Sequence, residues 1–369
     1  MSEQSNASNL PKVEFEDIIS DEGRLNKDIS QKFDNRKGIA FEPDHILYGK
    51  LRPYLKNWLF ANFKGVALGD FWVYEAINSS PTFNYYLIQG EKYQEVANLS
   101  TGTKMPRSDW NVVSETDFFI PFDMAEQTAI GSFFRNLDDI IAATQRQVAG
   151  LKQLKAAYLQ QMFPQAGECV PRVRFAGFTE KWELRELGTI SIKVSDKNKG
   201  IVYSETLTNS AERGIVSQRD FFDKDISNQK NLDGYFIVQP NDFVYNPRIS
   251  NHAPVGPIKR NLLGRTGVMS PLYYVFRITD GDLTFIEKYF ESIYWHEFMN
   301  LNGDNGVRAD RFNIKDSVFE KMPIPFPSLA EQTTIGNFLR NLDMQIETQS
   351  EKMEKLKQLK AAYLQKMFV

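Results

Sequence analysis

The sequence predicts an α+β protein in which two mixed domains alternate with two long helices that pair as an antiparallel coiled coil, giving a pseudo-twofold internal repeat. The first observation is a duplication: Ala125–Phe163 and Ala330–Phe368, displaced by 205 residues, are identical at 24 of 39 aligned positions. The second is that the stretches before the two copies resemble each other only weakly. We therefore expect a domain at 1–124, a helix at 125–163, a domain at 164–329 and a helix at 330–369.

Each duplicated segment is predicted to be one long helix, because its apolar residues recur at steps of four and three. Asp123-Met-Ala-Glu126 and Ser328-Leu-Ala-Glu331 are typical of capping boxes at helix starts. A helix with one exposed apolar stripe is unstable alone, so we expect the two copies to pack together rather than each to close only its own domain. The stripe contains Ile130, Phe134, Leu137, Ile141, Val148 and Leu151, and in the second copy Ile335, Leu339, Leu342, Ile346, Met353 and Leu356.

The two remaining domains are predicted to share one fold of short strands. Runs such as Phe71–Glu75, Tyr235–Val238 and Leu272–Phe276 are rich in β-branched and aromatic residues. Trp182–Gln239 is far longer than its counterpart Phe15–Glu42, so the first domain is expected to lack part of the opening region. Three landmarks occur in the same order in both domains: Glu42–Tyr48 and Gln239–Tyr245, Gly65-Val-Ala and Gly267-Val-Met, Gly102–Asp109 and Gly303–Asp310.

Composition narrows the class of protein. Cys169 is the single cysteine, so no disulfide can form within the chain, and His45, His252 and His296 are too scattered to predict a metal site. The sequence has no apolar run long enough for a membrane span and no apolar signal core, which indicates a cytoplasmic protein without a membrane partner. A phosphate-binding Gly-Lys-Ser/Thr loop is absent, and Tyr245-Asn-Pro-Arg248 only approaches the base-holding motif of DNA amino-methyltransferases. We expect neither catalytic residues nor a cofactor in this chain.

Local charge is the main functional signal, since the net charge is only −3. No acid occurs from His45 to Gly69 or from Phe243 to Thr279, and both stretches carry lysines and arginines at the same landmark. Such residues neutralise phosphates and read base edges, although a solvated surface is the alternative for any one of them. In the Gly-to-Asp landmark, the glycines are expected to form turns and Asp109 and Asp310 to cap short helices, while Tyr48 and Tyr245 are expected in the core. The DNA-binding candidates are Lys50, Arg52, Lys56, Lys104, Arg107, Arg248, Asn251, His252, Lys259, Arg260, Arg308 and Arg311.

The chain resembles the specificity subunits of Type I restriction-modification enzymes over nearly its whole length. The resemblance depends on Glu126-Gln-Thr-Ala-Ile-Gly and its copy at Glu331, on the repeated Leu-Lys-Gln-Leu-Lys-Ala-Ala-Tyr-Leu-Gln, and on the opening Val173–Gly188. It implies that each domain is a target recognition domain for one half of a bipartite double-stranded DNA site, with the helices as a ruler between the halves. It also implies a non-catalytic chain that binds two modification subunits, which methylate adenine with S-adenosylmethionine, and motor-nuclease subunits that use ATP.

Apolar helix residues outside the mutual stripe are the predicted contacts for these partner subunits: Phe133, Leu154, Phe338 and Leu359. Two other hypotheses stay open at this point. One is a self-contained DNA methyltransferase or nuclease, and the other is a structural scaffold that bridges proteins. The first domain departs from the family pattern because its start lacks the Phe-x-Gly-Phe…Trp sequence found at Phe175–Trp182.

Overall fold

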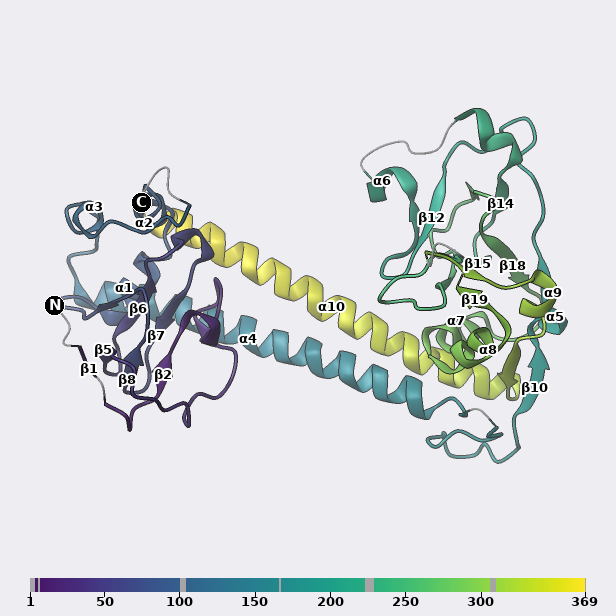
Figure 1. Ribbon diagram of the computed structural model, residues 1–369, viewed down its shortest axis with the longest axis horizontal. Helices are drawn as coiled ribbons and strands as arrows, with labels where there is room; N and C mark the ends of the chain where they lie inside the picture. Colours follow the sequence, from purple (N-terminus) through teal and green to yellow (C-terminus); the bar gives the residue numbers. More distant parts are fainter. Residues whose placement is uncertain are drawn as a thin grey trace. The chain divides into compact units, whose positions relative to one another are not determined.

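The chain forms two compact units in the computed structural model. The first unit contains residues 1–147 and 349–369, and the second contains residues 148–348. The structure describes residues 4–5, 7–99, 104–165, 167–222, 229–305 and 310–368. Helices α4 (Met124–Gln161) and α10 (Leu329–Met367) each contribute residues to both units (Figure 1).

The first unit is built on two small sheets and a hairpin. One sheet has the strand order β1-β5-β8-β2, in which only the β2–β8 pair is parallel, and the other is antiparallel with the order β7-β6-β9. The hairpin pairs β3 with β4. The strands are β1 (Gln4–Ser5), β2 (Lys12–Val13), β3 (Ile18–Ile19), β4 (Arg24–Leu25), β5 (Gly38–Phe41), β6 (Ile46–Gly49), β7 (Trp58–Phe60), β8 (Gly65–Ala67) and β9 (Phe71–Tyr74); the helices are α1 (Pro81–Leu87), α2 (Glu91–Ala97) and α3 (Trp110–Ser114).

The second unit has a four-stranded antiparallel sheet of order β11-β18-β15-β16 and four two-stranded pairs, β10-β21, β12-β13, β14-β17 and β19-β20. Its strands are β10 (Glu183–Glu186), β11 (Ser191–Lys193), β12 (Leu207–Ser210), β13 (Gly214–Ser217), β14 (Phe236–Val238), β15 (Phe243–Tyr245), β16 (Ile258–Arg260), β17 (Gly267–Met269), β18 (Tyr274–Ile278), β19 (Asp304–Asn305), β20 (Phe312–Asn313) and β21 (Pro323–Phe326). Its short helices are α5 (Leu187–Ile190), α6 (Gln218–Phe222), α7 (Leu283–Glu291), α8 (Tyr294–Asn302) and α9 (Asp316–Phe319).

One interior strand in each of the sheets β7-β6-β9 and β11-β18-β15-β16 is buried along its whole length. Every residue of β6 and of β15 is buried, which explains why these strands read as continuous apolar runs in the sequence. Tyr48 and Tyr245 occupy matching positions and are 1% and 3% exposed. Their predicted place in the core is confirmed.

The two long helices are antiparallel, as the sequence predicts. In the first unit the beginning of α4 packs against the end of α10, with the rings of Phe133 and Tyr363 5.2 Å apart. In the second unit the end of α4 packs against the beginning of α10, with the rings of Tyr158 and Phe338 4.8 Å apart. All positions of the predicted apolar stripe are buried or half-buried. The seam therefore forms from the same sequence used twice in opposite directions.

The predicted capping boxes form only in part. Asp123 Oδ1 accepts from Ala125 N at 2.8 Å, and Ser328 Oγ accepts from Glu331 N at 3.4 Å. The carboxylate of Glu331 binds the guanidinium of Arg174 instead of the helix start, because a charge-assisted bidentate pair is stronger than a bond to a backbone N–H.

A glutamine next to each cap joins the long helix to the rest of its unit. Gln127 donates to Pro121 O at 2.8 Å and accepts from Ser80 N at 2.9 Å. Its copy Gln332 donates to Pro327 O at 2.9 Å and accepts from Asp282 N at 2.8 Å. Both glutamine side chains are buried and hydrogen-bonded at each end, so they hold α1 and α7 in equivalent places.

The two units share one fold, and the second has additional elements at its start. Strands β5, β6, β7, β8 and β9 match β14, β15, β16, β17 and β18 in their pairing. Strands β10 and β11 and helix α5 have no counterpart among the described residues of the first unit. The shorter opening region of the first domain therefore corresponds to the loss of whole elements. None of the described helices combines the length and apolar character needed to span a bilayer.

Candidate nucleic-acid interface

Two basic segments of the first unit lie against each other although they are far apart in sequence. Arg52 N donates to Pro106 O at 2.7 Å, and Ser108 N donates to Lys50 O at 2.8 Å. The backbone of Arg52 is in the left-handed region, at φ +50°, so the chain turns sharply before Pro53. These bonds bring Lys50, Arg52 and Arg107 to one place, and Lys104 is exposed three residues before Arg107.

The second unit repeats this arrangement. Ile249 N donates to Asp310 O at 3.0 Å, and Phe312 N donates to Pro247 O at 2.8 Å, with Arg248 and Arg311 paired between them. We call this feature the paired-loop site: residues 50–52 with 106–108 in the first unit, and 247–249 with 310–312 in the second. The two backbone bonds correspond one to one, so each unit presents basic side chains from the same two loops.

The hydrogen bonds correct the predicted alignment of the second landmark. They match Arg107 with Arg311, because both lie opposite the middle residue of the first loop. Arg308, which the sequence alignment pairs with Arg107, lies outside the described residues, as does Gly102. Asp109 caps α3 as predicted, accepting from Asn111 N at 2.9 Å. The prediction for Asp310 was wrong, because α9 begins after Lys315 and its cap has no side-chain hydrogen bond.

The loop before β16 in the second unit is held in place from within. Asn246 donates to Asn209 O at 2.9 Å and accepts from Arg248 N at 3.0 Å, and Tyr245 Oη donates to Val255 O at 2.9 Å. Gly256 has a φ of +83°, and a side chain there would lie 2.1 Å from Asn246 O. This loop is pre-organised, which lowers the entropy lost when its side chains bind a ligand.

The arginines of the paired-loop sites differ in whether they have an ion-pair or hydrogen-bond partner. Arg248 and Arg311 are exposed and have no ion pair among the described residues. Arg107 pairs with Asp70 at 3.0 Å, and Nε of Arg52 is buried without a hydrogen-bond partner. A buried guanidinium donor without a partner is uncommon in a complete site, so a bound acceptor would satisfy it.

The basic stretch Phe243–Thr279 contains no acid in its sequence, but acids from other parts of the second unit lie next to it in the structure. Arg277 binds Asp242 at 2.6 Å, Arg265 binds Glu205 at 2.8 Å, and Arg260 reaches Glu287 at 3.3 Å. All three acids lie outside the stretch Phe243–Thr279, where strand pairing and packing bring them close. Of the arginines in this stretch, Arg248 alone has no acid partner among the described residues.

Lys259 and Arg260 lie on β16, are half-buried, and have acids of α7 near them. Burial lowers the pKa of Lys259, and Glu291 and Glu287 only partly offset this effect. Arg260 also bonds Asn241 Oδ1 at 2.6 Å. The structure therefore separates these two predicted DNA-binding residues from Arg248 and Arg311.

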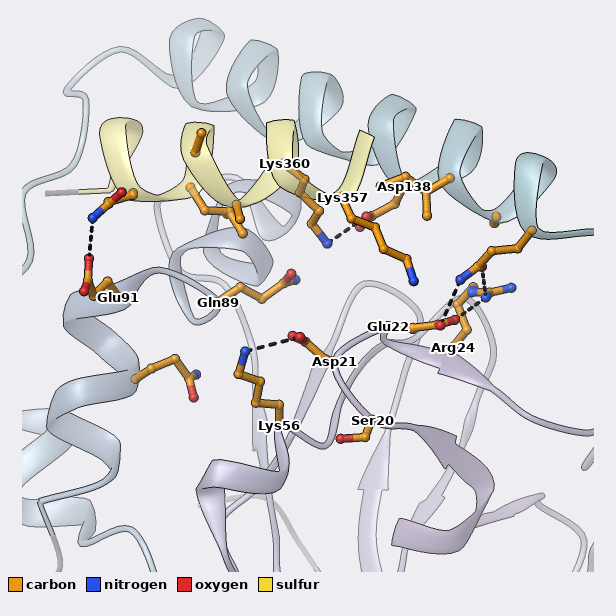
Figure 2. Close-up of a pocket in the computed structure, with 18 of the residues that line it drawn as sticks. Ser20, Asp21, Glu22, Arg24, Lys56, Gln89, Glu91, Asp138, Lys357 and Lys360 are labelled. Atoms are coloured by element: carbon orange, nitrogen blue, oxygen red, sulfur yellow. Dashed lines mark hydrogen bonds and ion pairs between the residues drawn. The ribbon is translucent and has the colours of Figure 1, made fainter. Parts of the chain in front are cut away.

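The remaining candidates lie beside acids or on the loop tip. His252 Nε2 is 3.0 Å from Glu212 Oε1, and Asn251 is exposed next to it. Lys56 pairs with Asp21 at 3.2 Å in a groove of about 950 Å³ within the first unit (Figure 2). Lys360 pairs with Asp138 at 2.7 Å in the same groove, and Lys357 extends into it from α10. Because acids offset most of its cations, this groove is a poor site for a phosphate.

A smaller cavity of about 330 Å³ opens beside the paired loops of the second unit. Arg311 and Asn313 line it together with Lys193 and the aromatic residues Tyr273 and Tyr274. Sequence reasoning missed Lys193, Tyr273 and Asn313, because nothing in the linear order indicates that β11, β18 and β20 meet here. Within the described ranges, no group of three or more His, Cys, Asp or Glu side chains could hold a metal ion.

Comparison with known proteins decides the family. Residues 180–358 match the family model described as "Type I restriction modification DNA specificity domain". This segment therefore belongs to that family. No curated protein matches it.

Two solved structures show that the specificity-subunit fold extends over the whole chain. One is a chain from the structure described as "Structural basis underlying complex assembly and conformational transition of the type I R-M system". It is 18% identical to this chain, with a TM-score of 0.53, and the alignment covers 98% of this chain and 90% of that one. The Type-I restriction-modification S subunit from M. genitalium is 12% identical, with a TM-score of 0.56, covering 100% and 93%. At these identities the likeness establishes the fold, which in this chain includes the duplicated helices and both paired-loop sites.

Proposed function

We propose that this specificity subunit reads a bipartite double-stranded DNA target, using the paired-loop site of each unit for one half of the target. The observation that carries the proposal is the recurrence of that site. The same two backbone hydrogen bonds bring Arg52 and Arg107 together in one unit and Arg248 and Arg311 in the other. Different side chains on one repeated frame are what the reading of two different half-sites requires.

Local charge supports this reading despite the net charge of −3. Arg248 and Arg311 are exposed without acid partners among the described residues, so they are available to phosphates or to guanine edges. Lys50, Lys104, Asn251 and His252 lie in or near the same loops and extend the proposed surface. Lys56, Lys259 and Arg260 have a weaker case, because acids of their own units already neutralise or surround them.

The chain is proposed to be non-catalytic and to recruit two modification subunits, with motor-nuclease subunits in a full complex. S-adenosylmethionine and ATP would then be bound by those partners in the cytoplasm. The duplicated helices offer each partner an equivalent apolar position: Leu154 and Leu359 are copies of each other and are 43% and 44% exposed. Phe133 and its copy Phe338, which the sequence placed outside the mutual stripe, contact Tyr363 and Tyr158 across the helix pair. Phe133 remains 39% exposed, whereas Phe338 also packs against Phe175.

Binding measurements test the DNA proposal directly. Replacing Arg248 and Arg311 together by Gln should weaken binding to DNA that carries the target sequence by about 10- to 100-fold. It should also reduce the slope of log affinity against log salt by about two. The matched control is Arg340→Gln combined with Arg146→Gln, an equal charge change at exposed positions of α10 and α4. Equal losses from the control and the double variant would contradict a specific role for the loops.

The alternative is a self-contained DNA methyltransferase or nuclease. It predicts that the isolated chain binds S-adenosylmethionine or cuts DNA without added subunits. The adaptor proposal predicts sequence-specific binding by the isolated chain and methylation only when modification subunits are present. A turnover assay with the purified chain, with and without those subunits, separates the two.

A further inference from the structure

The start of the long helix is covered in the second unit but bare in the first. We define the bare face as Ile120, Phe122, Glu126 and Phe133. The ring of Phe133 contacts Tyr363 of α10, as Phe338 contacts Tyr158, but Phe133 remains 39% exposed. By the repeat, the four residues of the bare face correspond to Ile324, Phe326, Glu331 and Phe338 of the second unit. The chemistry at the four positions is identical, so any difference in their surroundings comes from the rest of the chain.

A single segment, 173–186, covers the second unit's four residues. Arg174 donates to both carboxylate oxygens of Glu331, at 2.6 and 2.8 Å, and the ring of Phe175 lies 5.5 Å from that of Phe338. Strand β10 then pairs antiparallel with β21, and the guanidinium of Arg185 lies 4.6 Å from the centre of the Phe326 ring. The segment thus supplies an ion pair, an aromatic contact and a β-strand to one surface.

None of these partners exists for the bare face among the described residues of the first unit. Phe122 is 106% exposed and Ile120 is 49% exposed, whereas Ile324 is fully buried. Glu126 is exposed and has no ion pair among the described residues, whereas Glu331 is 1% exposed. Residues 118–122 form no strand, so their backbone groups are not paired in a sheet as those of β21 are.

Such a surface is costly to leave in water. Exposed apolar side chains beside an unpaired carboxylate and a backbone outside any sheet are typical of a protein-interaction site. An extended peptide can bind by adding a strand to this backbone while its side chains fill the neighbouring positions. The second unit shows which side chains fit, because the receiving residues are the same.

We propose that the bare face of the first unit docks an extended segment of another protein chain. The segment carries an Arg-aromatic pair for Glu126 and Phe133, followed about ten residues later by a short strand that pairs with residues 119–122, with the spacing of Arg174-Phe175 and Leu184-Arg185. The chain's own copy of this segment is not available, since Arg174 is bound to the buried Glu331. This docking does not depend on the proposed reading of DNA.

A labelled peptide with the sequence of residues 171–187 tests the proposal in the absence of DNA. Fluorescence anisotropy with the full chain should show saturable binding to one site. Glu126→Gln and Phe122→Ser, both at exposed positions, should each weaken binding about tenfold or more while leaving the thermal unfolding of the chain unchanged. The peptide with Arg174→Ala should lose affinity to a similar degree.

The matched control is Phe326→Ser, which alters the equivalent position of the second unit. Binding that persists in this variant places the peptide on the first unit. The proposal is overturned if no saturable binding occurs, or if Glu126→Gln and Phe122→Ser leave binding unchanged. It is also overturned if only Phe326→Ser removes binding, because the peptide would then be exchanging with the segment already in the second unit.

Discussion

Lys360 on α10 holds Asp138 on α4 at 2.7 Å in the first unit, and their copies Lys155 and Asp343 form the same ion pair in the second unit with the helices exchanged. Each duplicated segment thus supplies the acid near its beginning and the lysine near its end. This reciprocity requires antiparallel packing, because a parallel pair would place lysine beside lysine. The ion pair therefore specifies the direction of the helix pair as well as contributing to its stability.

The two copies of this ion pair are expected to differ in strength. Asp343 also binds Lys288 at 2.6 Å, whose side chain is only 5% exposed, whereas Asp138 accepts a hydrogen bond from Tyr86 at 2.9 Å. Asp343→Asn leaves a buried lysine with one acid fewer and should cost about 2 kcal/mol, against about 1 kcal/mol for Asp138→Asn. Urea unfolding measures both, and a larger loss for Asp138→Asn would contradict the assignment.

The stabilisation from Asp343 should depend on pH. Burial raises the pKa of Asp343, but hydrogen bonds from Lys155 and Lys288 outweigh it and lower the pKa below the ordinary 3.8. A carboxyl with a lowered folded-state pKa stabilises the fold above its unfolded value and loses that effect as pH falls through the folded value. The difference in unfolding free energy between the native chain and Asp343→Asn should be full at neutral pH and shrink below 3.8. A difference that is constant down to pH 2 would be inconsistent with this.

Two glycines at copied positions of the long helices should tolerate alanine unequally. A side chain at Gly131 would lie 2.4 Å from Thr82 Oγ1 and 2.8 Å from Phe83 N, whereas one at Gly336 would lie 3.0 Å from Phe285 N. We expect Gly131→Ala to cost about 2 kcal/mol and Gly336→Ala less than that, because backbone cannot yield easily. Gly150→Ala is the control, since nothing lies within 4 Å, and it should stabilise the helix by up to about 1 kcal/mol. Thermal unfolding measurements rank the three variants by stability, with Gly131→Ala expected to be the least stable.

Substitutions in one paired-loop site should change one half of the DNA target. With modification subunits present, Arg52→Gln combined with Arg107→Gln is expected to relax the first half of the methylated motif, and Arg248→Gln combined with Arg311→Gln the second half. The reason is that each pair belongs to a separate unit with its own loops. Sequencing of methylated adenines gives the result directly. If either double variant degrades both halves alike, the assignment of one unit to one half-site fails.

Lys259 should behave as a buried charge rather than as a principal DNA contact. Burial lowers its pKa from the ordinary 10.5, so the unfolded chain binds more protons and stability rises with pH between the folded value and 10.5. Lys259→Met removes this penalty and should raise stability at neutral pH, with a gain that shrinks as pH approaches 10.5. Its effect on DNA affinity should be smaller than that of Arg248→Gln in the same binding assay. If Lys259→Met weakens DNA binding as much as Arg248→Gln does, Lys259 is a principal DNA contact and this prediction is wrong.

The sequence alone determined the duplicated helices and their pairing, because apolar periodicity and capping residues are local signals that a linear pattern retains. It also determined the matched central strands, since burial on both faces leaves a continuous apolar run at Tyr48 and at Tyr245. Residues such as Ile130 and Ile335 could be placed in the seam without coordinates for the same reason.

Only the tertiary structure decided which cations are free. Asp242 and Glu205 lie outside the acid-free stretch in sequence but bind Arg277 and Arg265 in space, because β-strand pairing brings together residues that are tens of positions apart. The match of Arg107 with Arg311 likewise depends on hydrogen bonds between distant loops, which no local pattern records. Helical order follows from neighbours in the chain, whereas the charge of a surface follows from neighbours in the fold.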